Sequence, residues 1–288
     1  MRKIEIKEFF GKVLAEIFVD KYNCIVCDEE LRDTSKYGLC EQCESKLTFI
    51  QSRICKKCGR LQINEADYCL TCQQHKREFD FARSCIVYDD VAKEIVRGIK
   101  FGGKKYFAKY IANFLVEKYH SAFDGVKIDV VIPVPITKKK KKSRGYNQSW
   151  EIARSFAKAV DLLADNDIVV KIKDTKEQAR LSGVEREENT VGAFEVKDAD
   201  KVKDKIALIV DDVMTTGSTA SEIARILKKA KAKEVYLLTF ASTRYKVEGE
   251  RLEQERKQDT AQEENLTQEE KDQENVQDAS QQEIQNQQ

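Results

Sequence analysis

The segment from Ile206 to Thr219, IALIVDDVMTTGST, orders its residue types as a strand, two acids, a turn and the start of a helix. Its first five residues, Ile206 to Val210, form a short continuous apolar run, which is typical of a strand buried in a parallel sheet. A helical pattern begins at Ala220 and has an apolar face at the spacing expected of a helix: Ile223, Ile226, Leu227, Ala230. Because ligands of α/β sheets bind beyond the carboxyl ends of the strands, the segment predicts an α/β fold with a ligand site just after Val210.

The polar residues of this segment have the chemistry of a phosphate-and-ribose site. The paired carboxylates of Asp211 and Asp212 can accept hydrogen bonds from vicinal sugar hydroxyls or hold a hydrated Mg²⁺ ion. A phosphate suits the residues that follow, because a glycine permits close approach while hydroxyls and a helix N-terminus donate to the anion: Thr215, Thr216, Gly217, Ser218, Thr219. The alternative is a surface turn followed by a helix cap. The order of the whole string favours the phosphate site.

The same string resembles the phosphoribosyl-pyrophosphate (PRPP) binding motif of type I phosphoribosyltransferases, in which an apolar strand leads to two acids and a TTGxT-like loop. The resemblance implies that Asp211 and Asp212 orient the ribose of PRPP and that Thr215 to Thr219 hold its 5′-phosphate. The sequence contains neither a GxxxxGK[ST] nor a GxGxxG motif, since the nearest candidate, Gly102 to Lys105, lacks the leading Gly and the closing Ser/Thr. A P-loop ATPase and a dinucleotide-binding enzyme are therefore not expected.

Eight of the nine cysteines form four CxxC pairs, separated by 12, 11 and 10 residues: Cys24/Cys27, Cys40/Cys43, Cys55/Cys58, Cys69/Cys72. Each CxxC presents two thiolates to one ion, and two pairs complete a tetrahedral Cys₄ shell, so the count predicts two structural Zn²⁺ sites. We assign the first four cysteines to one ion and the last four to the other. Interleaved pairing and disulfides are the alternatives. Cys85, which lies alone in a strand-like stretch, is expected to be a buried apolar residue.

Between the cysteines and the PRPP-like motif, helical and strand patterns alternate. They predict helices around Phe107 to Leu115 and Ser149 to Val160, and strands around Val130 to Ile132 and Ile168 to Ile172. A further strand is predicted at Val235 to Phe240. Such alternation implies a mostly parallel sheet with helices on both faces.

A second polar stretch, IPVPITKKKKKSRGYNQSWEIA, follows the strand at Val130. Pro133 and Pro135 predict a stiff turn, five lysines follow from Lys138, and Arg144 to Gln148 open a helix. The stretch has the composition of an anion-binding loop. A solvated loop is the plain alternative, and attraction to the phosphate backbone of single-stranded nucleic acid is another.

Together with QARLSGVEREENTVGAF at Gln178 to Phe194 and the CxxC pairs, this stretch resembles the ComF family, competence-associated proteins that join a double zinc ribbon to a phosphoribosyltransferase domain. The resemblance covers approximately residues 20–245. It implies that Val134 to Lys142, including Lys138, form a loop on the pyrophosphate side of PRPP, and that Arg186 and Asn189 lie in a segment covering the site. Its candidate catalytic residues are Asp211, Asp212 and Arg144, with Arg144 stabilising the leaving pyrophosphate. Competence-machinery proteins are candidate partners on this resemblance, and the lysine run adds single-stranded DNA as a further candidate partner.

Four regions are expected along the chain. An amphipathic segment at 1–20 precedes a double zinc ribbon at 21–76 and a type I phosphoribosyltransferase-like α/β domain at 77–247. A tail at 248–288, with 13 acidic and 4 basic residues and many glutamines, is expected to be a disordered or solvated helical segment, because it cannot bury enough apolar area to fold. No apolar run approaches the roughly 20 residues that span a bilayer, and the N-terminal pattern lacks a signal-peptide core, so a cytoplasmic protein without membrane insertion is expected.

Two functions from different classes remain open. The chain is expected either to be a phosphoribosyltransferase that uses PRPP with Mg²⁺, in DNA uptake or nucleotide metabolism, or to be a catalytically silent scaffold that binds PRPP or a nucleotide. The acceptor cannot be read from the sequence.

Overall fold

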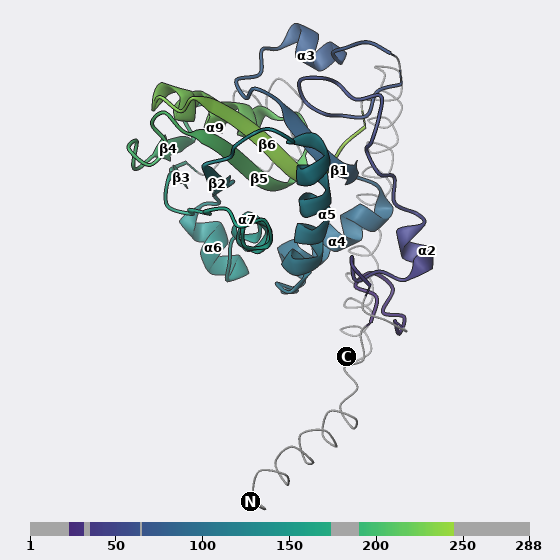
Figure 1. Ribbon diagram of the computed structural model, residues 1–288. Helices are drawn as coiled ribbons and strands as arrows, with labels where there is room; N and C mark the ends of the chain where they lie inside the picture. The colour runs from purple at the N-terminus through teal and green to yellow at the C-terminus, as the bar shows by residue number, and fades with distance from the viewer. Residues whose placement is uncertain (1–22, 32–34, 64, 174–189, 245–288) are drawn as a thin grey trace, which may run out of the picture. The chain divides into compact units, whose positions relative to one another are not determined.

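The computed structural model describes residues 23–31, 35–63, 65–173 and 190–244. Within them, four parallel strands form the main sheet in the order β1 (Ala82–Val87), β6 (Glu234–Ser242), β5 (Ile206–Met214) and β2 (Val130–Pro133) (Figure 1). β5 and β6 lie in the middle of this sheet, which explains the continuous apolar run in β5. The mostly parallel α/β sheet predicted from the sequence is confirmed.

Helices cover both faces of the sheet. α4 (Asp90–Phe101), α5 (Phe107–Ala122) and α7 (Gln148–Ala159) share one core with strand residues such as Leu208, Val210 and Phe240. α9 (Ser218–Lys229) packs on the opposite face (Figure 1). The helices predicted around residues 107–115 and 149–160 correspond to α5 and α7, and α9 begins two residues before the expected Ala220.

One predicted strand lies outside the main sheet. The strand expected at Ile168 to Ile172 is β3 (Val169–Lys171), and it pairs antiparallel with β4 (Phe194–Val196) in a separate two-stranded sheet. From the alternating pattern we expect this strand in the parallel sheet, and that prediction is wrong. Short apolar runs do not specify their pairing partner, which here comes from a segment more than twenty residues later.

The segment that follows the first two CxxC pairs joins the edge of the main sheet. After the short helix α2 (Glu41–Glu44), Phe49 forms an antiparallel bridge with Ile86 of β1, and the Ile50 N–H donates to the Cys85 carbonyl over 2.9 Å. The ring of Tyr37 stacks on Phe114 of α5, with 3.8 Å between ring centroids. The first cysteine-bearing segment is therefore packed on the α/β core.

The segment after the last CxxC pair is packed equally closely. The segment follows the short helix α3 (Leu70–Gln74). Its residue Phe79 is fully buried and lies beside Gly217 at the start of α9. The Glu78 N–H donates to the Ser221 hydroxyl over 3.0 Å. The Asp80 carboxylate lies 2.9 Å from the Lys228 ammonium. The described cysteine segments and the α/β core thus share extensive contacts.

Several expectations fall on residues outside the described ranges. These are the N-terminal segment 1–20, the tail 248–288, Arg186 and Asn189. Among the helices of the described residues, none has the length and apolar character needed to traverse a bilayer.

Candidate functional site

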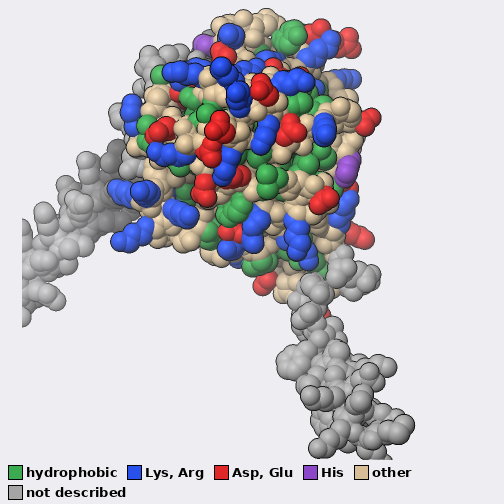
Figure 2. All heavy atoms as spheres, turned by 60° about the vertical axis from the view of Figure 1, so that its left-hand side comes forward, with side chains coloured by type: hydrophobic (Ala, Val, Ile, Leu, Met, Phe, Trp, Pro, Cys, Tyr) green, Lys and Arg blue, Asp and Glu red, His purple; other side chains and the backbone are tan. Residues whose placement is uncertain are grey.

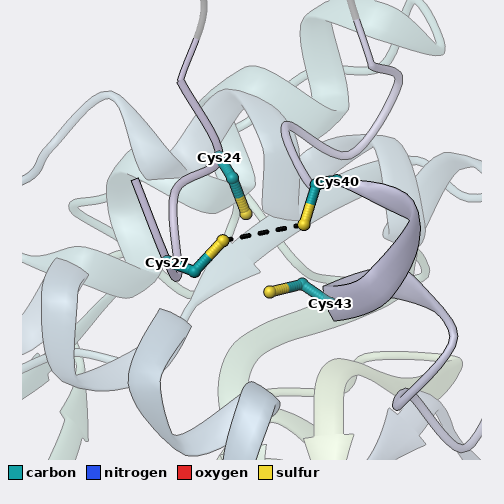
Figure 3. A group of neighbouring side chains, drawn as sticks. All are labelled: Cys24, Cys27, Cys40 and Cys43. Carbon is teal, nitrogen blue, oxygen red and sulfur yellow. Dashed lines mark hydrogen bonds between the residues drawn. The ribbon is translucent and has the colours of Figure 1, made fainter. Parts of the chain in front are cut away.

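The first four CxxC cysteines converge on one point. Their sulfur atoms all lie within 4.8 Å of one another, and Cys27 Sγ is 3.6 Å from Cys40 Sγ. Figure 3 shows the four side chains pointing toward a common centre, two from the loop at Cys24 and two from the start of α2. Four thiolates around a tetrahedral Zn²⁺ ion, each about 2.3 Å from the metal, are about 3.8 Å apart. The described side chains fit that ion.

The last four CxxC cysteines form a second cluster of the same kind. The sulfur atoms of Cys55, Cys58, Cys69 and Cys72 lie within 4.8 Å of one another, and Cys58 Sγ is 3.6 Å from Cys69 Sγ. Gly59 makes this knuckle possible, because it has a φ of +69° and a Cβ at this position would lie 2.3 Å from the Ala82 carbonyl oxygen. The sulfurs are grouped in sequential order, not interleaved.

Both clusters offer four protein ligands, the arrangement of structural zinc. Zinc bound there would fix each pair of knuckles and supply folding free energy. The ninth cysteine, Cys85, is 3% exposed, as expected, and burial raises the pKa of its thiol well above the ordinary range. It is therefore a poor nucleophile.

The two acids of the PRPP-like motif lie within β5, whereas the sequence placed them after the strand. Because β5 continues to Met214, their side chains alternate and meet different neighbours. Asp211 lines a pocket together with the loop Thr215 to Thr219 and Thr239 of β6, and its Oδ1 accepts a 2.7 Å hydrogen bond from the Ser149 hydroxyl. Burial raises the pKa of Asp211 to about 7, the charge of Asp212 adds to the rise, and Lys100 opposes it.

Asp212 is buried and faces α4. Its Oδ2 lies 2.6 Å from Lys100 Nζ, and its Oδ1 accepts from the Val213 N–H over 2.9 Å. Burial alone would lower the pKa of Lys100, but the charges of Asp212 and Asp211 outweigh it and the pKa is raised. No local pattern in the sequence marks Lys100, which precedes the stretch Gly102 to Lys105, as a site residue. The same holds for Ser149, which the sequence predicts only as the start of a helix.

The loop from Thr215 to Thr219 has the form of an anion cradle. Gly217, with a φ of +81°, is the N-cap of α9 and places no side chain over the first N–H groups of the helix. The hydroxyls of Thr216 and Ser218 contact each other, and the Ser218 N–H donates to Thr216 Oγ1 over 3.3 Å. A helix N-terminus with free N–H groups and hydroxyls nearby favours a phosphate.

The lysine-rich stretch, expected as a loop, is the helix α6 (Lys138–Arg144). Thr137 caps its N-terminus by accepting from the Lys140 N–H, and Gly145, at a φ of +86°, ends it. Lysine is a good helix former. A threonine before the run and a glycine after it are typical helix-capping residues, and they indicate a helix in spite of the consecutive charges. The helix that was expected to open after Arg144 begins at Gln148 as α7, with Asn147 as its cap.

The candidate residues around α6 lie near the motif to different degrees. The Val134 N–H donates to the Val210 carbonyl over 3.0 Å, so this chain segment runs beside β5 up to the acids. Lys138 is exposed, and Arg144 contacts the Gln148 amide and lies over the Phe101 ring, 5.4 Å from its centroid. Four predicted site residues are not among the described residues that line the pocket of Asp211: Asp212, Val134, Lys138 and Arg144.

We expect Asp211→Asn to stabilise the ligand-free protein at high pH. Because the pKa of Asp211 is raised from 3.8 to about 7, the ionised carboxylate costs folding free energy, and this cost grows as the pH rises through that window. The variant avoids it, by an amount on the order of a few kcal/mol at pH 8, while its amide oxygen still accepts from Ser149. Thermal unfolding of both proteins at pH 5 and pH 8 measures the effect. A melting-temperature difference that does not grow with pH would contradict it.

Comparison with known proteins agrees with this geometry. The phosphoribosyl transferase domain family matches residues 105–283, and the double zinc ribbon domain family matches residues 17–73. Competence protein F of Haemophilus influenzae is 27% identical, over 76% of this chain and 96% of its own length. Competence protein ComFC of Bacillus subtilis is 28% identical, over 77% and 95%. The DNA utilization protein YhgH of Escherichia coli K12 is 27% identical, over 72% and 91%.

Solved structures match only part of the chain. The allosteric regulatory enzyme of purine biosynthesis aligns with a TM-score of 0.34 and 20% identity over 50% of this chain and 30% of its own length. An adenine phosphoribosyltransferase aligns with a TM-score of 0.33 and 14% identity over 53% and 84%. By its match over more than half of its length, the chain belongs to the phosphoribosyl transferase domain family, with a double zinc ribbon before that domain, and its resemblance to the ComF family is confirmed.

Proposed function

We propose that this protein binds PRPP together with Mg²⁺ and transfers the phosphoribosyl group to an acceptor, in the service of DNA uptake or utilisation. The pocket shared by Asp211 and the loop Thr215 to Thr219 carries this proposal, because it joins a carboxylate suited to ribose hydroxyls with a helix N-terminus suited to a phosphate. The competence and DNA-utilisation relatives supply the cellular setting.

In this proposal, the loop at Gly217 holds the 5′-phosphate, while Asp211 and Asp212 accept hydrogen bonds from the ribose hydroxyls. Val134 and the residues of α6 lie on the pyrophosphate side, where Lys138 and Arg144 attract the leaving group by charge-assisted hydrogen bonds. The carboxylates of Asp211 and Asp212 would help to hold a Mg²⁺ ion that arrives with PRPP, and the ion would supply positive charge to offset that of the pyrophosphate.

The reaction replaces one bond at the anomeric carbon with another. The C1′–O bond to pyrophosphate breaks and its electron pair leaves with pyrophosphate, while a lone pair of the acceptor forms the new bond and the acceptor's proton passes to solvent. Positive charge develops on the ribose between these events, and the buried carboxylates beside it favour that charge. Catalysis in this site is positioning and electrostatics.

Isothermal titration with PRPP, with and without Mg²⁺, tests the binding part of the proposal. Assay of pyrophosphate release across nucleobase and amine acceptors then tests the transfer part. Binding followed by acceptor-dependent release supports a transferase. Absence of PRPP binding by the zinc-loaded protein would overturn the proposal.

A second function is a catalytically silent PRPP-binding scaffold that contacts single-stranded DNA or competence-machinery proteins. The observation that favours it is α6, which carries five consecutive lysines, four of them exposed, at the protein surface. On the face shown in Figure 2, however, lysines and arginines are interspersed with acidic side chains, so this face has no continuous basic stripe. Binding of PRPP without pyrophosphate release, together with salt-dependent binding of single-stranded DNA, would favour the scaffold over the transferase.

A further inference from the structure

The ion pair between Lys100 and Asp212 is the least exposed lysine–carboxylate pair that the structure describes. The side chain of Lys100 is 25% exposed and that of Asp212 is 3% exposed, with 2.6 Å between Nζ and Oδ2. The nearby pair of Lys105 and Glu151 has a similar separation of 2.9 Å, but its lysine side chain is 52% exposed. The Lys100 side chain is therefore less hydrated than that of Lys105, and its carboxylate partner belongs to the proposed ribose site.

The position of α4 places Lys100, in its last turn, beside Asp212. α4 starts after the carboxyl end of β1, where Asp89 caps it by accepting from the Ala92 N–H, and its last turn reaches Asp212 near the carboxyl end of β5. That last turn is held on both sides. The Tyr146 hydroxyl donates to the Ile99 carbonyl over 2.6 Å, and Gly98 lets α4 approach α5 so closely that a Cβ would lie 2.4 Å from the Phe107 ring.

A buried ion pair contributes little to stability relative to well-packed apolar residues, because desolvation offsets the attraction. Stability alone therefore does not account for a lysine at this position. Its geometry does act on the site, since both oxygens of Asp212 are engaged, one by Lys100 and the other by the Val213 N–H. These contacts fix the orientation of the Asp212 carboxylate beside Asp211, the acid that lines the pocket.

Lys100 also changes the charge that an incoming ligand meets. Asp211 and Asp212 are adjacent, and PRPP carries negative charge on its 5′-phosphate and its pyrophosphate. Without a cation, the two carboxylates would repel this ligand and each other in a partly buried site, where electrostatic interactions are stronger than in water. The ammonium of Lys100 cancels one of the two charges.

We propose that Lys100 is a positioning residue for PRPP: it holds Asp212 in the orientation that receives the ribose and lowers the negative charge of the site. This inference rests on the proposed function. It extends that function to a residue on α4, outside the strand, loop and α6 residues already assigned.

The test is titration of zinc-loaded wild type and variants with PRPP and Mg²⁺, with thermal unfolding of each protein. Lys100→Met is expected to weaken PRPP binding roughly 10- to 100-fold, the range typical of residues that orient a ligand-binding group. Lys100→Arg, which keeps the positive charge beside Asp212, is expected to bind PRPP more tightly than Lys100→Met. Lys105→Met is the matched control and should bind as wild type does, since Glu151 keeps its contact with Arg154 at 3.0 Å.

A double variant separates positioning from folding. Asp212→Asn with Lys100→Met removes both charges of the ion pair, and we expect it to bind PRPP no more weakly than Asp212→Asn alone, because Lys100 acts through Asp212. Wild-type affinity in folded Lys100→Met, or losses that simply add in the double variant, would overturn the inference. If wild type itself fails to bind PRPP, it is the proposed function that fails.

Discussion

Cys40→Ser should lose the zinc ion of the first cluster and lower the melting temperature of the α/β core as well. The free energy of structural zinc binding is about 10–16 kcal/mol in small zinc-finger peptides, and it is folding free energy. Loss of even a third of that value, about 3–5 kcal/mol, would lower the melting temperature of a domain of this size by roughly 6–20 °C. The effect reaches the core because the segment that follows Cys40 supplies Phe49 and Ile50 to the edge of β1.

Zinc content by mass spectrometry under native conditions and thermal unfolding measure the two parts of this expectation. Cys85→Ala is the control, because it removes a buried thiol outside both clusters and should keep two zinc ions per chain. Full zinc occupancy in Cys40→Ser would contradict the ligand set Cys24, Cys27, Cys40 and Cys43.

Asp212→Asn should weaken PRPP binding by at least roughly 30-fold. In the proposed site, the substitution removes a carboxylate charge that would accept from ribose hydroxyls, and it also leaves the Lys100 ammonium without its carboxylate. Truncating one partner of a buried, hydrogen-bonded charge pair costs about 2–5 kcal/mol or more of binding free energy where the pair meets the ligand, and each 1.4 kcal/mol is a factor of ten in affinity. Titration with PRPP and Mg²⁺ measures the loss directly.

Asp165→Asn provides a matched comparison for this variant. Asp165 also pairs with a lysine, Lys201, over 2.7 Å, and its side chain is 18% exposed. Breaking that pair should leave PRPP affinity unchanged. If both variants bind PRPP as wild type does, the assignment of Asp212 to the ligand site is wrong.

The sequence predicted those parts of the fold and site in which neighbouring residues determine their own geometry. The string from Ile206 to Thr219 contains a strand, a tight turn and a helix start in one continuous segment, so its structure could be inferred from neighbouring residues, while its role in PRPP binding stays a prediction. The CxxC pairs likewise place two sulfurs close by sequence alone, and the structure groups them in the sequential order that we favoured.

The parts that escaped the sequence depend on contacts between distant segments. Lys100 and Ser149 reach the two acids from α4 and α7, more than 60 residues away along the chain, and no local pattern marks either residue. The partner of β3 comes from β4 for the same reason. α6 is a different case. Its capping residues Thr137 and Gly145 indicate a helix in the sequence itself, whereas the run of lysines between them suggests a solvated loop.

The bridge between Phe49 and Ile86 has a consequence for solubility. β1 is an outer strand of the main sheet, with β6 on one side, and the segment around Phe49 occupies its other side. Uncovered outer strands are templates for pairing with another chain, and native proteins protect them. The segment around Phe49 covers this edge of β1, so loss of metal from the first cluster is expected to expose the strand edge and to favour edge-to-edge aggregation. Zinc supply would then determine how much protein stays dispersed, apart from any effect on the ligand site.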